Sequence, residues 1–477
     1  MFWAYGSYVG GRVLVLVSTA ILARLLGPED FGLVALALTF TVFLDTIGDL
    51  GVSQALIIVD DDEVERRANT AFRFTVGFGA GLTLLTAAIT PLVAAFFDRK
   101  ELLAIMPVLG LNFLIRSLGT THYALAQKRI DFRARTAAEL ADVVVRGGVG
   151  IGLALAGAGA WALVIGYVVG SLTTTIVLWA LSPWRPQLRA KRESLGKLLR
   201  FGGTLTAVDV LSGVIANVDY LFVGRVLGAN ALGLYTLGFR LPELIVFNLS
   251  VVAAQVLFPA FAALARDALA DAYVKALRFV LMIGLPTAAV LFILAEPVVL
   301  VAFGDKWRGS IEPMQILTLF AFLVTIGIPA GTAYKAVGRA DVVLKIAIPR
   351  AIVLVILLLL FTDRGIAAAA ACQAAVAGAA SIVEIGLASR LLRVRLREIA
   401  KTALPPLAAT AVLCGVLIGT DALMDGALPT LLVGCALGAV AYLGMLWLVA
   451  RDAVDYLMRT AFPGRARPVP AGDGTPA

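Results

Sequence analysis

Long apolar segments recur along the whole chain, and only short polar connections separate them. A helix needs roughly 20 apolar residues to cross a bilayer core that is about 30 Å thick. The clearest such segment ends in the run AIVLVILLLLF at residues 351–361. This pattern predicts an all-α polytopic membrane protein with about 14 transmembrane helices. The expected spans are 3–25, 33–58, 72–97, 102–126, 139–158, 160–181, 201–223, 233–260, 278–301, 311–334, 342–361, 365–390, 402–423 and 427–450.

Composition and charge support this interpretation. Hydrophobic residues make up 60% of the 477 positions and charged residues 15%, which is too little polar surface for a soluble protein of this size. With the N-terminus placed in the cytosol, 28 Lys and Arg fall on inner connections and 7 on outer ones. That bias matches the positive-inside rule and predicts that both termini are cytosolic. The net charge of +8 is thus an orientation signal, and no nucleic-acid partner is expected.

Cysteine and histidine usage excludes several kinds of chemistry. Cys372, Cys414 and Cys435 lie in apolar segments without metal-ligand spacing, so packing thiols are expected. The single histidine, His122, cannot form a metal cluster, and it is a poor basis for a Ser-His-Asp triad. We therefore expect no cofactor, no metal site, no catalytic residues and no enzymatic activity. Membrane sequence follows Met1 directly, which leaves open whether the natural start lies upstream.

The two halves of the chain are related by an internal repeat. The sequence Ala23–Gly27 aligns with Gly224–Gly228, and Gly32-Leu33 aligns with Gly233-Leu234, at an offset of 201. Each half holds six predicted helices, so both enter the membrane from the same face and form a parallel repeat. The predicted division is an N-terminal lobe (1–182), a basic cytosolic linker (183–200), a C-terminal lobe (201–398), two further helices (399–450) and a disordered cytosolic tail (451–477).

Two like-oriented lobes suggest alternating access, in which one lobe rocks against the other. Prolines within spans can kink helices and fit such motion; the second half has them at 242, 286, 297, 313, 329 and 349. Pro297 and Pro313 are instead expected at helix ends.

Charged residues inside the spans are the candidate functional residues, because each costs about 2.5–3.5 kcal/mol to insert at mid-membrane. Arg12 and Arg116 have no obvious local partner, which favours a position lining a wet cavity. Asp142–Arg146 and Arg240/Glu243 have spacings that allow ion pairs within one helix. For these we weigh simple packing equally with a transport role. Asp45 and Asp49 share one helix face, and Asp219 lies in the weakly apolar span 201–223, together with Asp209.

Several blocks of the sequence resemble one family. ILARLLGPEDFGLVALALTF and DTIGDLGVSQALI, then AQKRIDF, VGRVLGANALGLYTLGFRLPEL and FGDKWRGSIEPMQIL, occur in this order. They are similar to polysaccharide exporters of the multidrug/oligosaccharidyl-lipid/polysaccharide superfamily, in the colanic acid and teichuronic acid exporter branch. The resemblance covers about residues 3 to 400 and is weak over the last two helices.

The resemblance implies a flippase for a lipid-linked oligosaccharide, carried on undecaprenyl pyrophosphate, in the bacterial cytoplasmic membrane. Guanidinium groups suit phosphate, so Arg12, Arg116, Arg146 and Arg240 are the expected substrate-binding residues. Asp45, Asp49 and Asp219 are the candidates for coupling to an ion. Expected partners are the lipid-linked substrate, membrane lipid and the polysaccharide polymerase machinery.

Three alternatives remain open at this point. A cation-coupled multidrug exporter of the same superfamily would be favoured by an acidic, apolar cavity. A peptidoglycan-precursor flippase would share the mechanism and carry a different cargo. A membrane polysaccharide polymerase is disfavoured, because the outer connections are too short to hold a catalytic domain.

Overall fold

The computed structural model describes residues 2–48, 56, 64–129, 131–187, 213, 215 and 217–449. Within these ranges every regular element is helical, so the all-α prediction is confirmed. Asp49, Asp209, most of the 183–200 linker and the whole 451–477 tail lie outside the described residues.

The chain divides into two compact units, each assembled from separated stretches. The first comprises Met1–Leu244, Val299–Ala321 and Asp341–Ala380, and the second comprises Ile245–Val298, Phe322–Ala340 and Ser381–Ala477. These units differ from the lobes expected at 1–182 and 201–398, and the division into repeat lobes stays a prediction.

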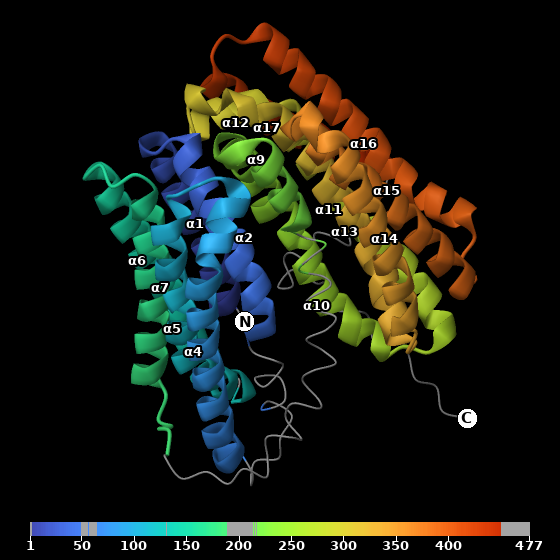
Figure 1. Ribbon diagram of the computed structural model, residues 1–477. Helices are drawn as coiled ribbons and strands as arrows, with labels where there is room; N and C mark the ends of the chain where they lie inside the picture. The colour runs from blue at the N-terminus through green and yellow to red at the C-terminus, as the bar shows by residue number, and fades with distance from the viewer. Residues whose placement is uncertain are drawn as a thin grey trace, which may run out of the picture. The chain divides into compact units, whose positions relative to one another are not determined.

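The first unit is built around helices that run side by side, with α4, α5, α6 and α7 in continuous contact (Figure 1). Its elements are α1 (Phe2–Leu25), α2 (Pro28–Gly48), α4 (Val64–Phe97), α5 (Leu102–Lys128), α6 (Phe132–Leu155), α7 (Ala160–Leu181), α9 (Gly228–Pro242), η4 (Asp305–Ser310), α14 (Ala340–Phe361) and η5 (Thr362–Arg364).

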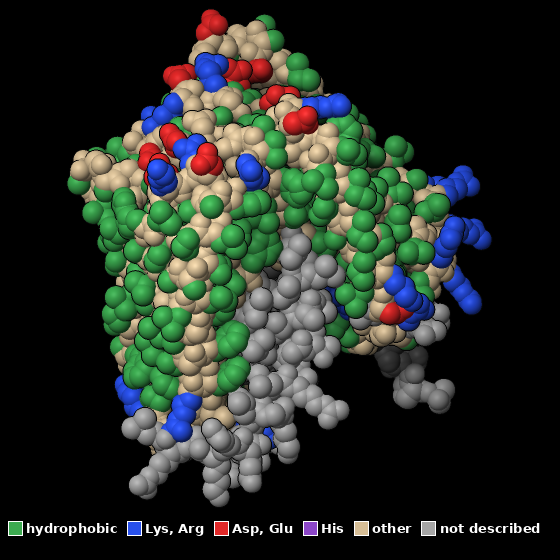
Figure 2. Space-filling model, viewed as in Figure 1, with side chains coloured by type: hydrophobic (Ala, Val, Ile, Leu, Met, Phe, Trp, Pro, Cys, Tyr) green, Lys and Arg blue, Asp and Glu red, His purple; other side chains and the backbone are tan. Residues whose placement is uncertain are grey.

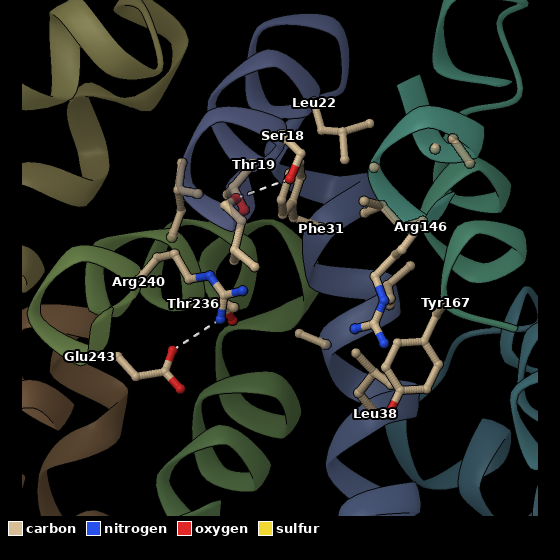
Figure 3. Close-up of a pocket in the computed structure, with 18 of the residues that line it drawn as sticks. Ser18, Thr19, Leu22, Phe31, Leu38, Arg146, Tyr167, Thr236, Arg240 and Glu243 are labelled. Carbon is tan, nitrogen blue, oxygen red and sulfur yellow. Dashed lines mark hydrogen bonds and ion pairs between the residues drawn. The ribbon is translucent and has the colours of Figure 1, made fainter. Parts of the chain in front are cut away.

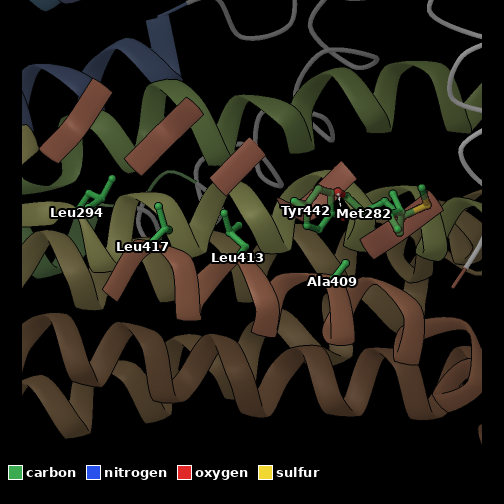
Figure 4. Close-up of a cluster of buried hydrophobic side chains, with 7 residues drawn as sticks. Met282, Leu294, Ala409, Leu413, Leu417 and Tyr442 are labelled. Carbon is green, nitrogen blue, oxygen red and sulfur yellow. Dashed lines mark hydrogen bonds between the residues drawn. The ribbon is translucent and has the colours of Figure 1, made fainter. Parts of the chain in front are cut away.

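The second unit holds α10 (Asn248–Ala262), α11 (Arg266–Ile293), α16 (Leu396–Leu423) and α17 (Ala427–Val449). Several helices contribute to both units, chiefly α12 (Ala295–Ala302), α13 (Ile311–Ala336) and α15 (Ile366–Leu391). The core of the second unit lies where α11, α16 and α17 meet (Figure 4). There the Tyr442 hydroxyl donates to the Met282 carbonyl at 2.6 Å, in the same cluster as the buried Leu413 and Leu417.

Nine helices within the described residues are long and apolar enough to cross a membrane. Their flanks carry exposed aliphatic side chains such as Leu84, Leu92 and Ile382, and Figure 2 shows hydrophobic side chains covering these flanks while charged side chains gather toward helix ends. Exposed apolar surface of this extent needs lipid to cover it. The chain is a multi-pass membrane protein, and the number of fourteen spans stays a prediction.

The predicted spans and the observed helices agree closely in places. The helices α5, α7, α13, α14, α15 and α17 begin and end within two residues of the predicted bounds. Pro297 and Pro313 lie in the first turns of α12 and α13, where their missing N–H groups have no helical partner to lose. Both positions confirm the expectation that these prolines mark helix ends.

The span expected at 233–260 is not one regular helix. It consists of α9, a π-helical segment at Glu243–Phe247, and α10. Pro242 ends α9 and has no N–H group to donate a backbone hydrogen bond. Immediately after it, the hydrogen bonds of the α-helix give way to the wider spacing of a π-helix. Single π-turns of this kind often occur at functional sites.

Candidate functional site

The crossing of α6 and α7 positions Arg146, the central arginine of the site. Gly166 and Gly170 form a GxxxG pattern on α7, which allows two membrane helices to approach closely. A Cβ on Gly166 would lie 2.9 Å from the Arg146 carbonyl oxygen, and one on Gly170 would overlap the Asp142 carboxylate. Small residues on α7 therefore leave the space that Asp142 and Arg146 occupy.

Arg146 is held on two sides. Its Nη2 donates to both carboxylate oxygens of Asp142 at 2.8 and 2.9 Å, which confirms the predicted pairing along one helix. Its guanidinium also lies 4.5 Å from the centre of the Tyr167 ring on α7, a favourable cation–π distance. The Nε atom is buried and has no hydrogen-bond partner in the described part of the chain. Both hydrogen bonds to Asp142 come from Nη2, so they occupy only part of the donor capacity of the Arg146 guanidinium.

A polar cavity of about 740 Å³ lies within the first unit, between α2, α4, α5, α6 and α7. Its charged lining comprises Arg116 and Arg146 together with Asp45, Glu139 and Asp142. Arg116 Nη1 donates to Asp45 at 2.5 Å, and both side chains are accessible, at 50% and 39%. Hydroxyl groups and backbone make up much of the remaining wall, which therefore suits a polar ligand.

A second cavity of about 360 Å³ adjoins the first, because Val143, Arg146 and Tyr167 line both. Figure 3 shows Arg146 and Arg240 extending from opposite walls toward its interior. Arg240 Nη1 donates to Glu243 at 3.0 Å, so this predicted pair is also confirmed. The nearby Thr236 hydroxyl is buried and has no hydrogen-bond partner among the residues described.

One end of the smaller cavity is closed by a crossing of α2 and α9. A Cβ on Gly32 would overlap the Ala229 carbonyl, and a Cβ on Gly233 would overlap the Pro28 carbonyl. Gly32 and Gly233 are repeat equivalents at the offset of 201, and so are Pro28 and Ala229. This reciprocity is what a two-fold axis between related elements produces. On α2 the cavity lining begins at Phe31, next to Gly32, and on α9 it begins at Thr236, about one turn after Gly233.

Hydrogen bonds fasten this closed end to the η4 segment. Trp307 is fully buried and its indole N–H donates to the Ala23 carbonyl at 2.8 Å. Lys306 Nζ donates to the Arg24 carbonyl at 2.9 Å, and Arg24 Nη2 donates to the Val301 carbonyl at 2.5 Å. The Arg24 side chain therefore joins the end of α1 to the end of α12, and it lines neither cavity.

The remaining candidate residues are distributed as follows. Arg12 is exposed on α1 and lies outside the linings of both cavities. Asp219 is buried, and its Oδ2 accepts a hydrogen bond of 2.6 Å from the Tyr235 hydroxyl. Tyr220, the residue after Asp219, lines the smaller cavity. Asp49 lies outside the described residues, so its position cannot be compared with that of Asp45.

Sequence reasoning missed Tyr167 and Thr236, which contact the site without carrying a charge. Tyr167 lies inside the GxxxG pattern of Gly166 and Gly170. That pattern alone could have predicted that α7 packs on a neighbouring helix and that Tyr167 lies beside the contact. Nothing in the sequence distinguishes Thr236 from the many other threonines within the spans.

Among the residues that the structure describes, no group of three or more His, Cys, Asp or Glu side chains lies close enough to hold a metal ion. The linings of the two cavities present guanidinium, carboxylate, hydroxyl and aromatic groups. Such groups bind ligands through charge and hydrogen bonds.

Curated relatives and solved structures resemble the chain over most of its length. The lipopolysaccharide biosynthesis protein WzxC of Escherichia coli (strain K12) is 27% identical over 70% of this chain and 68% of its own. The teichuronic acid biosynthesis protein TuaB of Bacillus subtilis (strain 168) is 25% identical over 71% of each chain. The structure of the lipid II flippase MurJ in an inward closed conformation has a similar fold, with a TM-score of 0.79 and 15% identity, covering 95% of this chain and all of that one.

A match to a protein-family model shows which family the chain belongs to. Residues 21–312, more than half of the chain, match the family described as polysaccharide biosynthesis protein. This range contains the α2–α9 crossing, the whole lining of the larger cavity, most of the lining of the smaller one and all three of the arginines that line them. On this match and the sequence relatives, the chain belongs to the polysaccharide biosynthesis protein family.

Proposed function

We propose that this protein is a flippase that moves an undecaprenyl-pyrophosphate-linked oligosaccharide across the bacterial cytoplasmic membrane by alternating access, for cell-surface polysaccharide biosynthesis. It acts as a transporter and makes no covalent change in its cargo. Its termini lie in the cytosol, and it delivers its cargo to the polysaccharide polymerase machinery. Membership of the polysaccharide biosynthesis family and the names of the relatives support this function.

One observation carries the proposal: Arg116, Arg146 and Arg240 project from the walls of two adjoining cavities inside a lipid-facing helical unit. Arginine N–H groups bind phosphate oxygens through paired, charge-assisted hydrogen bonds. The hydroxyl-rich walls can hydrogen-bond sugars, while the polyprenyl chain stays in the bilayer. The pyrophosphate would occupy the space near Arg146, where the two cavities meet.

Each of the three arginines already has a carboxylate partner, and this suggests how transport is coupled to an ion. Arg116 cannot bind phosphate fully while its Nη1 is bonded to Asp45. Binding of the pyrophosphate would therefore release Asp45, which then favours a proton or a sodium ion. Binding of the substrate and binding of the ion would thus be coupled through one pair of residues. Asp219 and Asp49 are secondary candidates for the same role.

Replacing Asp45 by asparagine tests this exchange. Asp45→Asn removes the competing charge, so we expect tighter binding of the lipid-linked substrate together with slower release and slower turnover. The variant should also lose the dependence of transport on the coupling ion gradient. Transport into vesicles, measured with and without an imposed pH or sodium gradient, checks both points. Unchanged gradient dependence in Asp45→Asn would exclude Asp45 from coupling.

The membrane potential can add to this coupling. Moving one elementary charge across the membrane changes the free energy by about 2.3 kcal/mol per 100 mV. Outward movement of a pyrophosphate with two negative charges is favoured by twice that amount when the inside is negative. Export therefore needs only modest assistance from an ion.

A cationic cargo is the second candidate, because four carboxylates share the cavity walls with the three arginines. Asp45, Glu139, Asp142 and Glu243 are these four. A multidrug exporter would use them and would tolerate loss of the arginines. A peptidoglycan-precursor flippase would need the arginines but would carry a different sugar, and a polymerase would need catalytic groups at the outer surface.

Deletion of the gene, followed by complementation, distinguishes these functions. We expect one exported polymer to vanish and its lipid-linked intermediate to accumulate on the cytosolic face. Arg116→Ala should fail to restore the polymer while inserting normally, and Arg116→Lys should restore it partly, because lysine keeps the charge but not the paired geometry. Arg99→Ala is the matched control, since Arg99 also pairs with a carboxylate, Glu29, at 2.8 Å. Full rescue by Arg116→Ala, or drug sensitivity instead of polymer loss, would refute the proposal.

A further inference from the structure

The turn between α15 and α16, in the second unit, forms a pocket that the proposed transport cycle does not use. Its volume is about 530 Å³. Val383, Leu387 and Leu396 provide an apolar wall, and Arg390 and Arg393 provide a basic one. Charge distribution in the sequence predicts that this turn faces the cytosol. The pocket thus has an apolar side that lies along the helix and a cationic side at its end.

The cations at this turn have no acidic partners. Arg390, Arg393, Arg395, Arg397 and Lys401 are all exposed, and none of them forms an ion pair with any carboxylate that the structure describes. In contrast, Lys345 near the start of α14 pairs with Asp341 at 3.0 Å. Five cations and a single carboxylate, Glu398, lie within these twelve residues, so the cations repel one another and an anionic ligand would relieve this repulsion.

Arg393 occupies a backbone position that usually belongs to glycine. Its φ is +57°, and the Val394 N–H donates to the Ser389 carbonyl at 2.9 Å across the end of α15. This is the Schellman arrangement, in which the residue after the cap is left-handed and is usually Gly. A side chain is strained in this conformation, because its Cβ lies too close to the following carbonyl oxygen. The chain therefore keeps an arginine where glycine would be more stable, which points to a use for its guanidinium.

The apolar wall of the pocket continues down the helix toward the bilayer interior. Val383, Leu387 and Arg390 lie on one face of α15, spaced by four and three residues. Val383 and Leu387 are exposed, and Gly386 beside them leaves a gap: a Cβ built there would have no heavy atom within 4 Å. Figure 2 shows basic side chains at the edge of the molecule where the α15–α16 turn lies in Figure 1.

We propose that this pocket binds an anionic phospholipid, with the phosphate at Arg390 and Arg393 and one acyl chain along Val383, Gly386 and Leu387. Basic pockets at helix ends on the cytosolic side attract acidic lipid headgroups. A soluble anion would contact only the two arginines. A neutral phospholipid would contact only the apolar wall. The occupant that uses both walls is a lipid with a net negative headgroup, taken directly from the surrounding bilayer.

Arg393→Gly gives a sharp test, because glycine suits the backbone and removes only the charge. Native mass spectrometry of the purified full chain would measure binding of dioleoylphosphatidylglycerol and, as a lipid with identical chains, dioleoylphosphatidylcholine. We expect the tightest phosphatidylglycerol site to weaken about fivefold in Arg393→Gly and about 25-fold in Arg390→Ala/Arg393→Gly. Phosphatidylcholine binding should not change. Lys100→Ala removes an exposed cation at another turn and should leave the site intact.

Gly386→Leu tests the apolar wall, since the new side chain fills open space and should not disturb folding. It should weaken phosphatidylglycerol binding while both arginines remain. Equal phosphatidylglycerol affinity in the wild type and Arg390→Ala/Arg393→Gly would overturn the proposal. So would competition by inorganic phosphate at concentrations similar to those of the lipid, which would indicate a plain anion site. Preferential binding of undecaprenyl phosphate over phosphatidylglycerol would instead identify a substrate site.

Discussion

Replacing Gly32 by alanine should reduce polymer export to background, although the change adds a single methyl group. The new Cβ would overlap the Ala229 carbonyl and approach the Gly233 amide nitrogen. Both neighbours are backbone atoms of a helix and cannot rotate away. The α2–α9 crossing must therefore separate, and the smaller cavity would then open at the end that the crossing closes. Alternating access requires the cavity to be closed at this end in one of its two states, so we expect transport to be lost.

The matched control is Gly81→Ala on α4. A Cβ at Gly81 meets no heavy atom within 4 Å, so the same substitution should raise helix propensity slightly and leave export unchanged. Complementation of the deletion strain measures export. Spin labels at the exposed positions Leu25 and Asp305 measure the closed end, and Gly32→Ala should shift their distance distribution to longer values. Export equal to that of Gly81→Ala would contradict the role of the crossing.

The reciprocal variant adds a test of the symmetry. Gly233→Ala should be as damaging as Gly32→Ala, because its Cβ would overlap the Pro28 carbonyl. Once either methyl group has separated the helices, the second has no close contact left to break. The double variant should therefore lengthen the label distance little beyond either single one. Such non-additivity is expected of residues that share one contact.

The sequence allowed prediction of features that depend on one helix or on the repeat. The Asp142–Arg146 and Arg240–Glu243 pairs follow from spacings of four and three residues along one helix, and both occur. The aligned repeat identifies Gly32 and Gly233 as equivalent residues, but the structure was needed to show that they lie where equivalent residues meet.

Features that depend on which helices meet were beyond prediction. The Arg116–Asp45 pair joins residues 71 positions apart, and hydrophobic periodicity does not state which two helices face each other. The π-helical segment after Pro242 was anticipated only as a kink, since proline indicates where a ladder is interrupted but not how it resumes. Arg12 had the same sequence signal as Arg116, yet of the two only Arg116 is in the lining of the cavities described above.

Replacing Arg146 by alanine should lower transport at limiting substrate by about a hundredfold, the effect expected when a charged group loses its hydrogen bonds to a desolvated phosphate. Arg146 has this large effect because it lines both cavities. Arg146→Lys should recover part of the activity, since a point charge remains but the planar donors are lost. The Arg99→Ala control removes an ion-paired arginine outside both cavities and should transport normally.

A double variant separates substrate binding from a structural role. If Arg146 serves only to neutralise Asp142, then Asp142→Asn combined with Arg146→Gln gives a neutral pair of similar shape and should restore transport. If Arg146 binds the pyrophosphate, the double variant should fold and insert normally but remain as inactive as Arg146→Ala. Flipping assays on the purified variants, with membrane insertion measured alongside, decide between these outcomes. We expect no recovery, because glutamine can donate only two N–H bonds and carries no charge to offset that of the pyrophosphate.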